Sequence, residues 1–117
     1  MRDAMDALRP LHPEVVGINC VPARRLGPDL LALASAAPGR ALSAYGNLGL
    51  PAEDSGWAFT EELAPALYAG VASTWMSPRL RIVGGCCGTT AAHTAALRGL
   101  LDSAESGQRI SIASPNE

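Results

Sequence analysis

The sequence predicts an α/β domain in which parallel strands alternate with helices. Three short, largely apolar runs, 14–19, 40–45 and 80–83, have the length and composition of buried strands. Segments with apolar residues at helical spacing lie between and around them. Alternation of this kind is typical of parallel strands that are joined by right-handed helical crossovers.

Helical periodicity predicts four helices. They are Met1–Leu11, a segment that opens at Gly27-Pro28-Asp29 and ends near Pro38, a segment from Thr60 to about Ser73, and a last helix capped by Thr89 or Thr90. Proline at an early helical position and an acid in the first turn are both favoured at helix starts. The expected buried faces are Leu63, Leu67 and Val71 on the third helix, and His93, Leu97, Leu100 and Leu101 on the last.

The rest of the chain is expected to be irregular. Gly46 to Gly49 is predicted to be a loop, because Gly and Asn are frequent in turns. We expect one domain at 1–103, followed by a polar tail at 104–117.

Composition excludes several classes of protein. With 117 residues, 48% hydrophobic and 17% charged, the chain fits one folded domain and not a disordered segment. A formal charge of −2 with scattered arginines gives no basic surface for nucleic acid. The longest apolar stretch, 30–37, is too short to span a membrane. Three cysteines are an odd number, so we expect no disulfide framework and a cytoplasmic location.

The three cysteines all follow predicted strands. Cys20 comes after the first, and Cys86 and Cys87 come after the third, within the glycine-rich segment 83–90. If the sheet is sequential, as in a β/α barrel, the carboxyl ends of the first and third strands lie two strand spacings apart, about 10 Å, and the thiols can converge. A doubly wound sheet, the other order open to such a pattern, would favour this convergence less. Three thiolates with one open position are a ligand set that suits catalytic zinc.

Other interpretations of these residues stay open. A buried free cysteine often behaves as a small hydrophobic residue. The segment 84–90 could instead cradle a phosphate with backbone N–H groups, although it lacks the spacing and the lysine of a P-loop. A redox pair is less favoured because the cysteines are adjacent. His93 is interpreted as a core or surface residue and not as a ligand.

The motifs also resemble those of a known family. Gly17-Ile18-Asn19-Cys20, Tyr45-Gly46-Asn47-Leu48-Gly49, Trp57 and the segment 82–90, in this order, are similar to the carboxyl-terminal part of homocysteine S-methyltransferases. The similarity extends over about residues 1–103.

The resemblance implies a site and an activity. The fold would be the carboxyl-terminal portion, about strands six to eight, of a (β/α)8 barrel, with Zn²⁺ held by Cys20, Cys86 and Cys87. Tyr45 and Asn47 would lie near the substrate at the end of strand seven. The implied reaction transfers a methyl group from an activated donor to the thiolate of homocysteine and gives methionine.

The chain also departs from the family pattern. A full barrel has eight strands in about 250 residues, and only three strands are predicted here. Gly46, Leu48 and Leu50 replace a proline, a serine and a glutamate of the family's substrate loop, and Ala91 replaces a proline. We therefore expect a truncated or split enzyme that needs a complementary chain, or else a non-catalytic zinc-binding relic.

Overall fold

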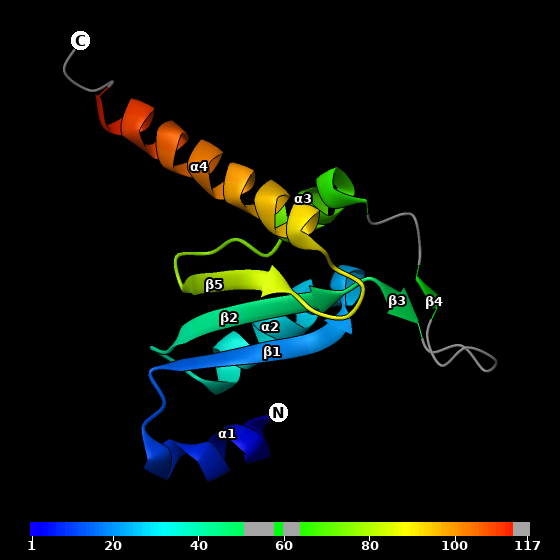
Figure 1. Ribbon diagram of the computed structural model, residues 1–117. Helices are drawn as coiled ribbons and strands as arrows, with labels where there is room; N and C mark the ends of the chain where they lie inside the picture. Colours follow the sequence, from blue (N-terminus) through cyan, green and yellow to red (C-terminus); the bar gives the residue numbers. More distant parts are fainter. Residues whose placement is uncertain (51–57, 60–63, 114–117) are drawn as a thin grey trace.

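A three-stranded parallel sheet forms the centre of the molecule. The computed structural model describes residues 1–50, 58–59 and 64–113. The strands β1 (Val15–Pro22), β2 (Ala41–Asn47) and β5 (Leu80–Gly85) pair in the order β1-β2-β5. Each new strand is therefore added at the same edge (Figure 1). The parallel arrangement predicted from the alternating pattern is confirmed, and of the two strand orders that the pattern left open, the sequential one is found.

One helix precedes the sheet, and a helix comes after each of its three strands along the chain. The helices are α1 (Arg2–Leu8), α2 (Leu26–Ala36), α3 (Pro65–Ser73) and α4 (Ala91–Ala113), with short 3-10 turns at Arg9–Leu11 and Ala23–Arg25. The short strands β3 (Gly49–Leu50) and β4 (Ala58–Phe59) form a separate antiparallel pair. Figure 1 shows α2 behind β1 and β2, and α3 and α4 together beside β5. No helix in the described part of the chain has the length and apolar character needed to cross a membrane.

The strands extend further than their apolar runs indicated. The loop predicted over Gly46 to Gly49 is wrong in part, because Gly46 and Asn47 are the last residues of β2 and Gly49 begins β3. Gly46 pairs with Val21 on one side and with Gly85 on the other. Pairing with two neighbouring strands therefore overrides the weak strand propensity of these residues.

The helix boundaries also differ from the predicted ones. The third helix begins at Pro65, where the missing N–H of proline is tolerated, and the predicted cap Thr60 lies outside the described residues. The last helix begins at Ala91, after the predicted cap Thr90, but it continues to Ala113. The first part of the predicted polar tail, 104–113, is therefore helical.

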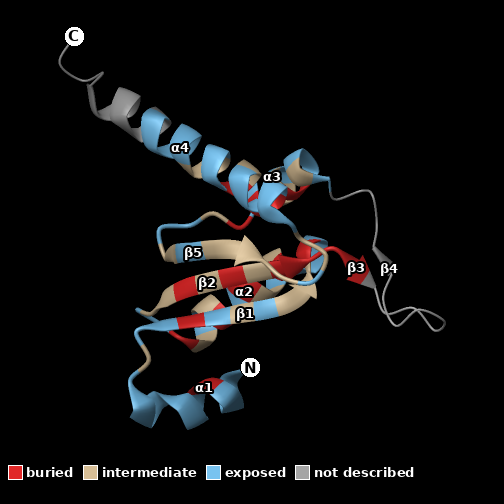
Figure 2. Ribbon diagram, in the orientation of Figure 1, coloured by how far each residue is buried: buried red, intermediate tan, exposed pale blue. Residues whose placement is uncertain are grey.

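The core lies between the sheet and its helices (Figure 2). One cluster contains Ala23, Leu26, Leu30, Ala44, Leu48, Tyr68, Ala72, Trp75 and Leu97, and a second contains Met5, Val16, Leu33, Ala37 and Leu42. Each large apolar side chain buried in this way contributes about 1.5–3 kcal/mol to stability. On α4 the predicted face is confirmed, since His93 and Leu97 are buried.

The predicted face of α3 is wrong in part, because Val71 packs against the core but Leu67 does not. Leu67 is 53% exposed, whereas Tyr68 and Ala72 are buried, and Leu63 lies outside the described residues. The apolar spacing was consistent with more than one face, and packing against α4 selects the face that carries the aromatic ring.

The opposite face of the sheet is uncovered among the described residues. Val15, Gly17 and Asn19 of β1 are exposed, while Val16 between them is buried, as expected when successive residues point to opposite faces. Ile82 of β5 is 42% exposed. In the described part of the chain β1 and β5 each pair along one edge within this sheet, so two edges and one face are free to contact further structure.

Arg79 joins the start of β5 to the end of α2. Its Nε donates to the Arg40 carbonyl at 2.9 Å and its Nη1 to the Ala34 carbonyl at 2.9 Å, and Nη2 donates to the Ala37 carbonyl. A cation at a helix carboxyl terminus also interacts favourably with the helix dipole.

We expect Arg79→Ala to lower the free energy of unfolding by about 2 kcal/mol, because several carbonyls lose a charged donor. Urea denaturation of the full chain measures the change. Arg81→Ala, at an exposed position on the same strand, is the control and is expected to change stability by less than about 0.5 kcal/mol. Equal stability of the two variants would contradict the role of Arg79.

Candidate metal centre

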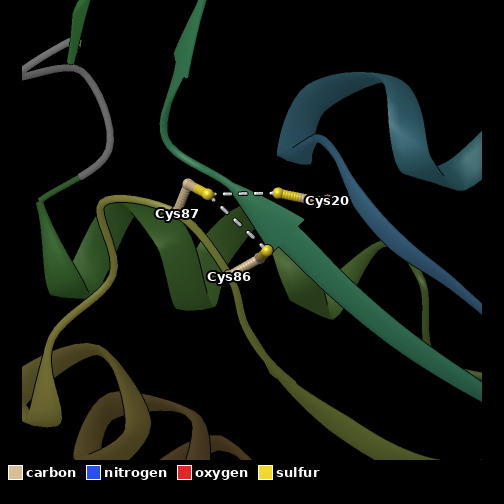
Figure 3. A group of neighbouring side chains, drawn as sticks. All are labelled: Cys20, Cys86 and Cys87. Carbon is tan, nitrogen blue, oxygen red and sulfur yellow. Dashed lines mark hydrogen bonds between the residues drawn. The ribbon is translucent and has the colours of Figure 1, made fainter. Parts of the chain in front are cut away.

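Cys20 lies at a β-bulge near the end of β1. Asn19 pairs with Tyr45 and Val21 pairs with Gly46, so the register skips Cys20. The φ angle of Cys20 is 61°, in the left-handed region that residues other than glycine seldom adopt. The bulge takes the side chain out of the regular alternation of the strand. As a result, the Cys20 thiol points toward the loop that follows β5 (Figure 3).

The other two thiols belong to that loop. The N–H of Cys86 donates to the Gly46 carbonyl at 3.0 Å, which extends the contact between β2 and β5 by one residue. The Cys86 carbonyl accepts hydrogen bonds from the backbone N–H of Thr89 at 3.1 Å and from its hydroxyl at 2.7 Å. Gly88 has a φ of 84°, which glycine adopts without a steric penalty. This turn lets adjacent Cys86 and Cys87 present their thiols to the same site (Figure 3).

The three sulfur atoms form one cluster. Cys20 Sγ lies 3.4 Å from Cys87 Sγ, which lies 4.0 Å from Cys86 Sγ. All three lie within 4.8 Å of one another. Three sulfurs bound to one tetrahedral zinc at about 2.3 Å would be about 3.8 Å apart. The separations and the donor type therefore fit zinc, and the convergence predicted from the strand ends is confirmed.

The thiols differ in acidity. The neighbouring Cys86 thiol, followed by the backbone N–H of Cys87, lowers the pKa of Cys20 to about 7. The proximity of Cys20, together with burial, raises the pKa of Cys86 to about 11. In the metal-free protein a thiolate at Cys20 is therefore stabilised near neutral pH, at the expense of ionisation at Cys86.

This difference predicts the order of thiol alkylation. In the reduced, metal-free chain, the rate of Cys20 labelling by iodoacetamide should rise to half its maximum near pH 7, because the thiolate is the reactive form. While Cys20 is still unmodified, the initial rate of Cys86 labelling should rise only near pH 11, because Cys20 raises the pKa of Cys86. Peptide mass spectrometry measures both rates, and Cys20→Ser should remove the fast reaction. Equal labelling of Cys20 and Cys86 at pH 7.5 would contradict the assignment.

Asn47 contacts the bulge directly. Its side chain is 2% exposed, and Nδ2 donates to the Cys20 carbonyl at 2.7 Å and lies 3.9 Å from Cys20 Sγ. Its Oδ1 accepts from the N–H of Gly49 at 3.3 Å. The structure thus brings Asn47 to the thiol cluster, and both ends of its amide are held by hydrogen bonds.

Tyr45 lies on the uncovered face of the sheet. Its ring is seated on Gly84, where an added Cβ would come within 2.6 Å of Tyr45 Cε1. A shallow hollow on this face is lined by Gly17, Ile18, Asn19, Ser43 and Tyr45. Tyr45 is therefore placed in this hollow, whereas Asn47 is placed at the thiols. Trp57, the other aromatic residue among the motifs that resemble the family, lies outside the described residues.

Two further residues near the site have structural contacts. His93 is buried, and its Nδ1 lies 3.1 Å from the backbone N–H of Thr90 and 3.0 Å from its hydroxyl. The expectation that it is a core residue is therefore confirmed. Tyr68, which the sequence did not single out, is buried and has its hydroxyl between Gly46 and Gly84. One tyrosine within an apolar helix gives no sequence signal for such a role.

Comparison with protein families decides the relationship. The profile of the homocysteine S-methyltransferase family matches residues 1–101. The chain belongs to this family. Comparison with curated proteins gave no match.

A solved structure supports membership in the homocysteine S-methyltransferase family. The chain is similar to the homocysteine methyltransferase MmuM from Escherichia coli, in its oxidized form, with a TM-score of 0.63 and 29% sequence identity. The match covers 84% of this chain and 29% of the MmuM chain. The expected fold class is confirmed, namely an α/β arrangement of parallel strands and helices that corresponds to part of a (β/α)8 barrel.

Proposed function

We propose that this chain provides the zinc-binding part of a homocysteine S-methyltransferase. The observation that carries the proposal is the cluster of three thiols, one from β1 and two from the loop after β5, within 4.8 Å of one another. Cys20, Cys86 and Cys87 would hold the ion, and three protein ligands leave one position for a substrate. When bound, zinc would act as a Lewis acid that favours the thiolate form of homocysteine.

The residues of the chain account for the other requirements of the site. Cys87 is exposed, so a substrate thiol can approach from its side of the cluster. Tyr45 and Asn47 are the proposed substrate residues, Tyr45 through the hollow on the sheet and Asn47 through its place beside Cys20. The substrate thiolate would attack the methyl group of an activated donor, and the bond between the methyl group and the donor would break to give methionine.

We further propose that methyl transfer requires the other strands of the barrel. A (β/α)8 barrel has eight strands, and the chain spans 29% of the MmuM chain. Among the described residues, β1 and β5 offer free edges and one face of the sheet is uncovered. The other strands would pair there, in the same polypeptide or in a complementary chain.

We also propose a cytoplasmic location, because three free thiols fit the reducing conditions of the cytoplasm.

Two measurements on the purified chain test the proposal. Elemental analysis should find one zinc per chain, and chelation should remove it. Methionine should form from homocysteine and a methyl donor only when the remaining barrel strands are present. Zinc binding without transfer in that complete assembly would favour the non-catalytic relic. Nucleotide binding that is insensitive to chelator, without stoichiometric zinc, would favour the phosphate-binding alternative.

A further inference from the structure

The hydroxyl of Tyr68 lies between the ends of two strands that carry the site. It donates to the Gly84 carbonyl at 2.8 Å or to the Gly46 carbonyl at 3.0 Å. It also accepts from the N–H of Gly46 at 3.2 Å. Gly46 belongs to β2 and Gly84 to β5. A single side chain from α3 thus joins the two strands next to the cysteine loop.

The position of this hydroxyl is fixed by packing on both sides. Tyr68 is fully buried. Its ring meets Trp75 edge-on at a centroid distance of 5.8 Å, and it meets His93 edge-on at 5.6 Å. Such edge-to-face pairs are favourable arrangements of aromatic rings. Because His93 belongs to α4 and Trp75 follows the end of α3, the ring is restricted by two separate parts of the chain.

The same backbone groups hold the cysteines. The Gly46 carbonyl that faces Tyr68 also accepts the N–H of Cys86 at 3.0 Å. Gly84 precedes Cys86 by two residues at the end of β5. On the other side, Gly46 pairs with Val21, the residue next to the bulged Cys20. Movement of Gly46 would therefore change the separation of Cys20 from Cys86 and Cys87.

We propose that Tyr68 is a positioning residue for the three-thiol centre, which it serves by setting the spacing between the ends of β2 and β5. The inference rests on the proposed zinc site and adds a residue that does not touch the metal. Burial raises the pKa of Tyr68 to about 12, so the hydroxyl keeps its proton as a hydrogen-bond donor at neutral pH. Without the hydroxyl, buried Gly46 and half-buried Gly84 lose hydrogen bonds, and the strand ends must shift to recover them.

The test compares Tyr68→Phe with the wild-type full chain and with a control. Leu42→Val is the control, since Leu42 is buried in the same sheet but lies at the opposite end of β2. Circular dichroism establishes that each variant is folded. Zinc affinity is measured by competition with a chromogenic chelator, and the geometry of the centre is measured by the absorption spectrum of the Co²⁺-saturated chain.

We expect Tyr68→Phe to weaken zinc binding by about 10- to 100-fold relative to the wild type, as is common for substitution of residues that hold metal ligands in place. At Co²⁺ saturation it should lose intensity in the thiolate-to-cobalt band, while Leu42→Val keeps the wild-type spectrum. A loss of stability alone would not alter a saturated spectrum. If Tyr68→Phe matches Leu42→Val in both measurements, the positioning role is wrong. A wild-type chain that binds no zinc would overturn the proposed metal centre itself.

A second variant covers the case in which Tyr68→Phe does not fold. Trp75→Phe keeps the Tyr68 hydroxyl and loosens the ring contact that fixes it. It should give a smaller change in the same direction in both measurements. Wild-type affinity and spectrum in this variant would then overturn the inference.

Discussion

Cys86→Ser is expected to abolish stoichiometric zinc binding by the purified chain. Cys86 supplies one of three sulfurs that lie within 4.8 Å of one another, and a serine hydroxyl is a poor replacement for a thiolate ligand at neutral pH. Substitution of a residue that only holds a metal ligand in place commonly weakens metal binding 10- to 100-fold. Loss of the ligand itself should therefore weaken binding by more than about 100-fold.

Chelator competition measures this loss, and elemental analysis gives the stoichiometry. Ser73→Ala removes an exposed hydroxyl that bonds to Gly70 on α3, and this control should retain one zinc per chain. The same loss is expected for Cys20→Ser and Cys87→Ser. Full zinc stoichiometry at wild-type affinity in Cys86→Ser would contradict the three-thiolate site.

Asn47→Asp should destabilise the metal-free chain by about 3 kcal/mol at pH 7.5, although the two side chains have nearly the same shape. The substitution replaces the Nδ2 donor, 2.7 Å from the Cys20 carbonyl, with a carboxylate oxygen that faces another oxygen. The site is 2% exposed, and an uncompensated buried charge is strongly unfavourable.

The pH dependence identifies the cause. Burial beside a carbonyl should raise the pKa of the new carboxyl above its value of about 3.9 in the unfolded chain. The folded variant then loses stability as pH rises from about 3.9, the pKa in the unfolded chain, to the higher pKa in the folded chain. Stability returns as pH falls, because the protonated carboxyl can again donate a hydrogen bond to the Cys20 carbonyl. Urea denaturation at several pH values should show the deficit of Asn47→Asp narrowing toward pH 5. Asn47→Ala carries no charge, so its deficit should change with pH only near pH 7, where Cys20 ionises without its Asn47 contact, and it should stay constant between pH 5 and pH 6. Parallel pH profiles for the two variants would contradict this explanation.

The alternating pattern was sufficient to predict parallel strands, although it left their order in the sheet open. Parallel strands in sequential order place their carboxyl ends together, so the meeting of Cys20 with Cys86 and Cys87 followed from topology. The last helix was predicted from Leu97 and its neighbours because their spacing is regular.

Other features depend on tertiary contacts that carry no local signal. At the bulge, the register between β1 and β2 skips Cys20. No residue type in β1 predicts this irregularity. Gly46 and Asn47 have turn propensity, yet Gly46 pairs with both neighbouring strands and Asn47 pairs with Pro22 of β1, which keeps them in β2. Tyr68 acts through a hydroxyl that meets two strands, a contact that helical periodicity does not reveal.

The cysteine cluster joins parts of the chain that are far apart in sequence. Cys86 and Cys87 are adjacent and can offer two sulfurs even in an unfolded chain, but Cys20 lies 67 residues from Cys87. Bringing the ends of so long a segment together costs conformational entropy, and only the contacts made on folding offset this cost. The third ligand therefore becomes available together with the β1-β2-β5 sheet. A metal that requires all three thiolates would bind the native chain selectively, and by mass action its concentration would raise the thermal midpoint of unfolding.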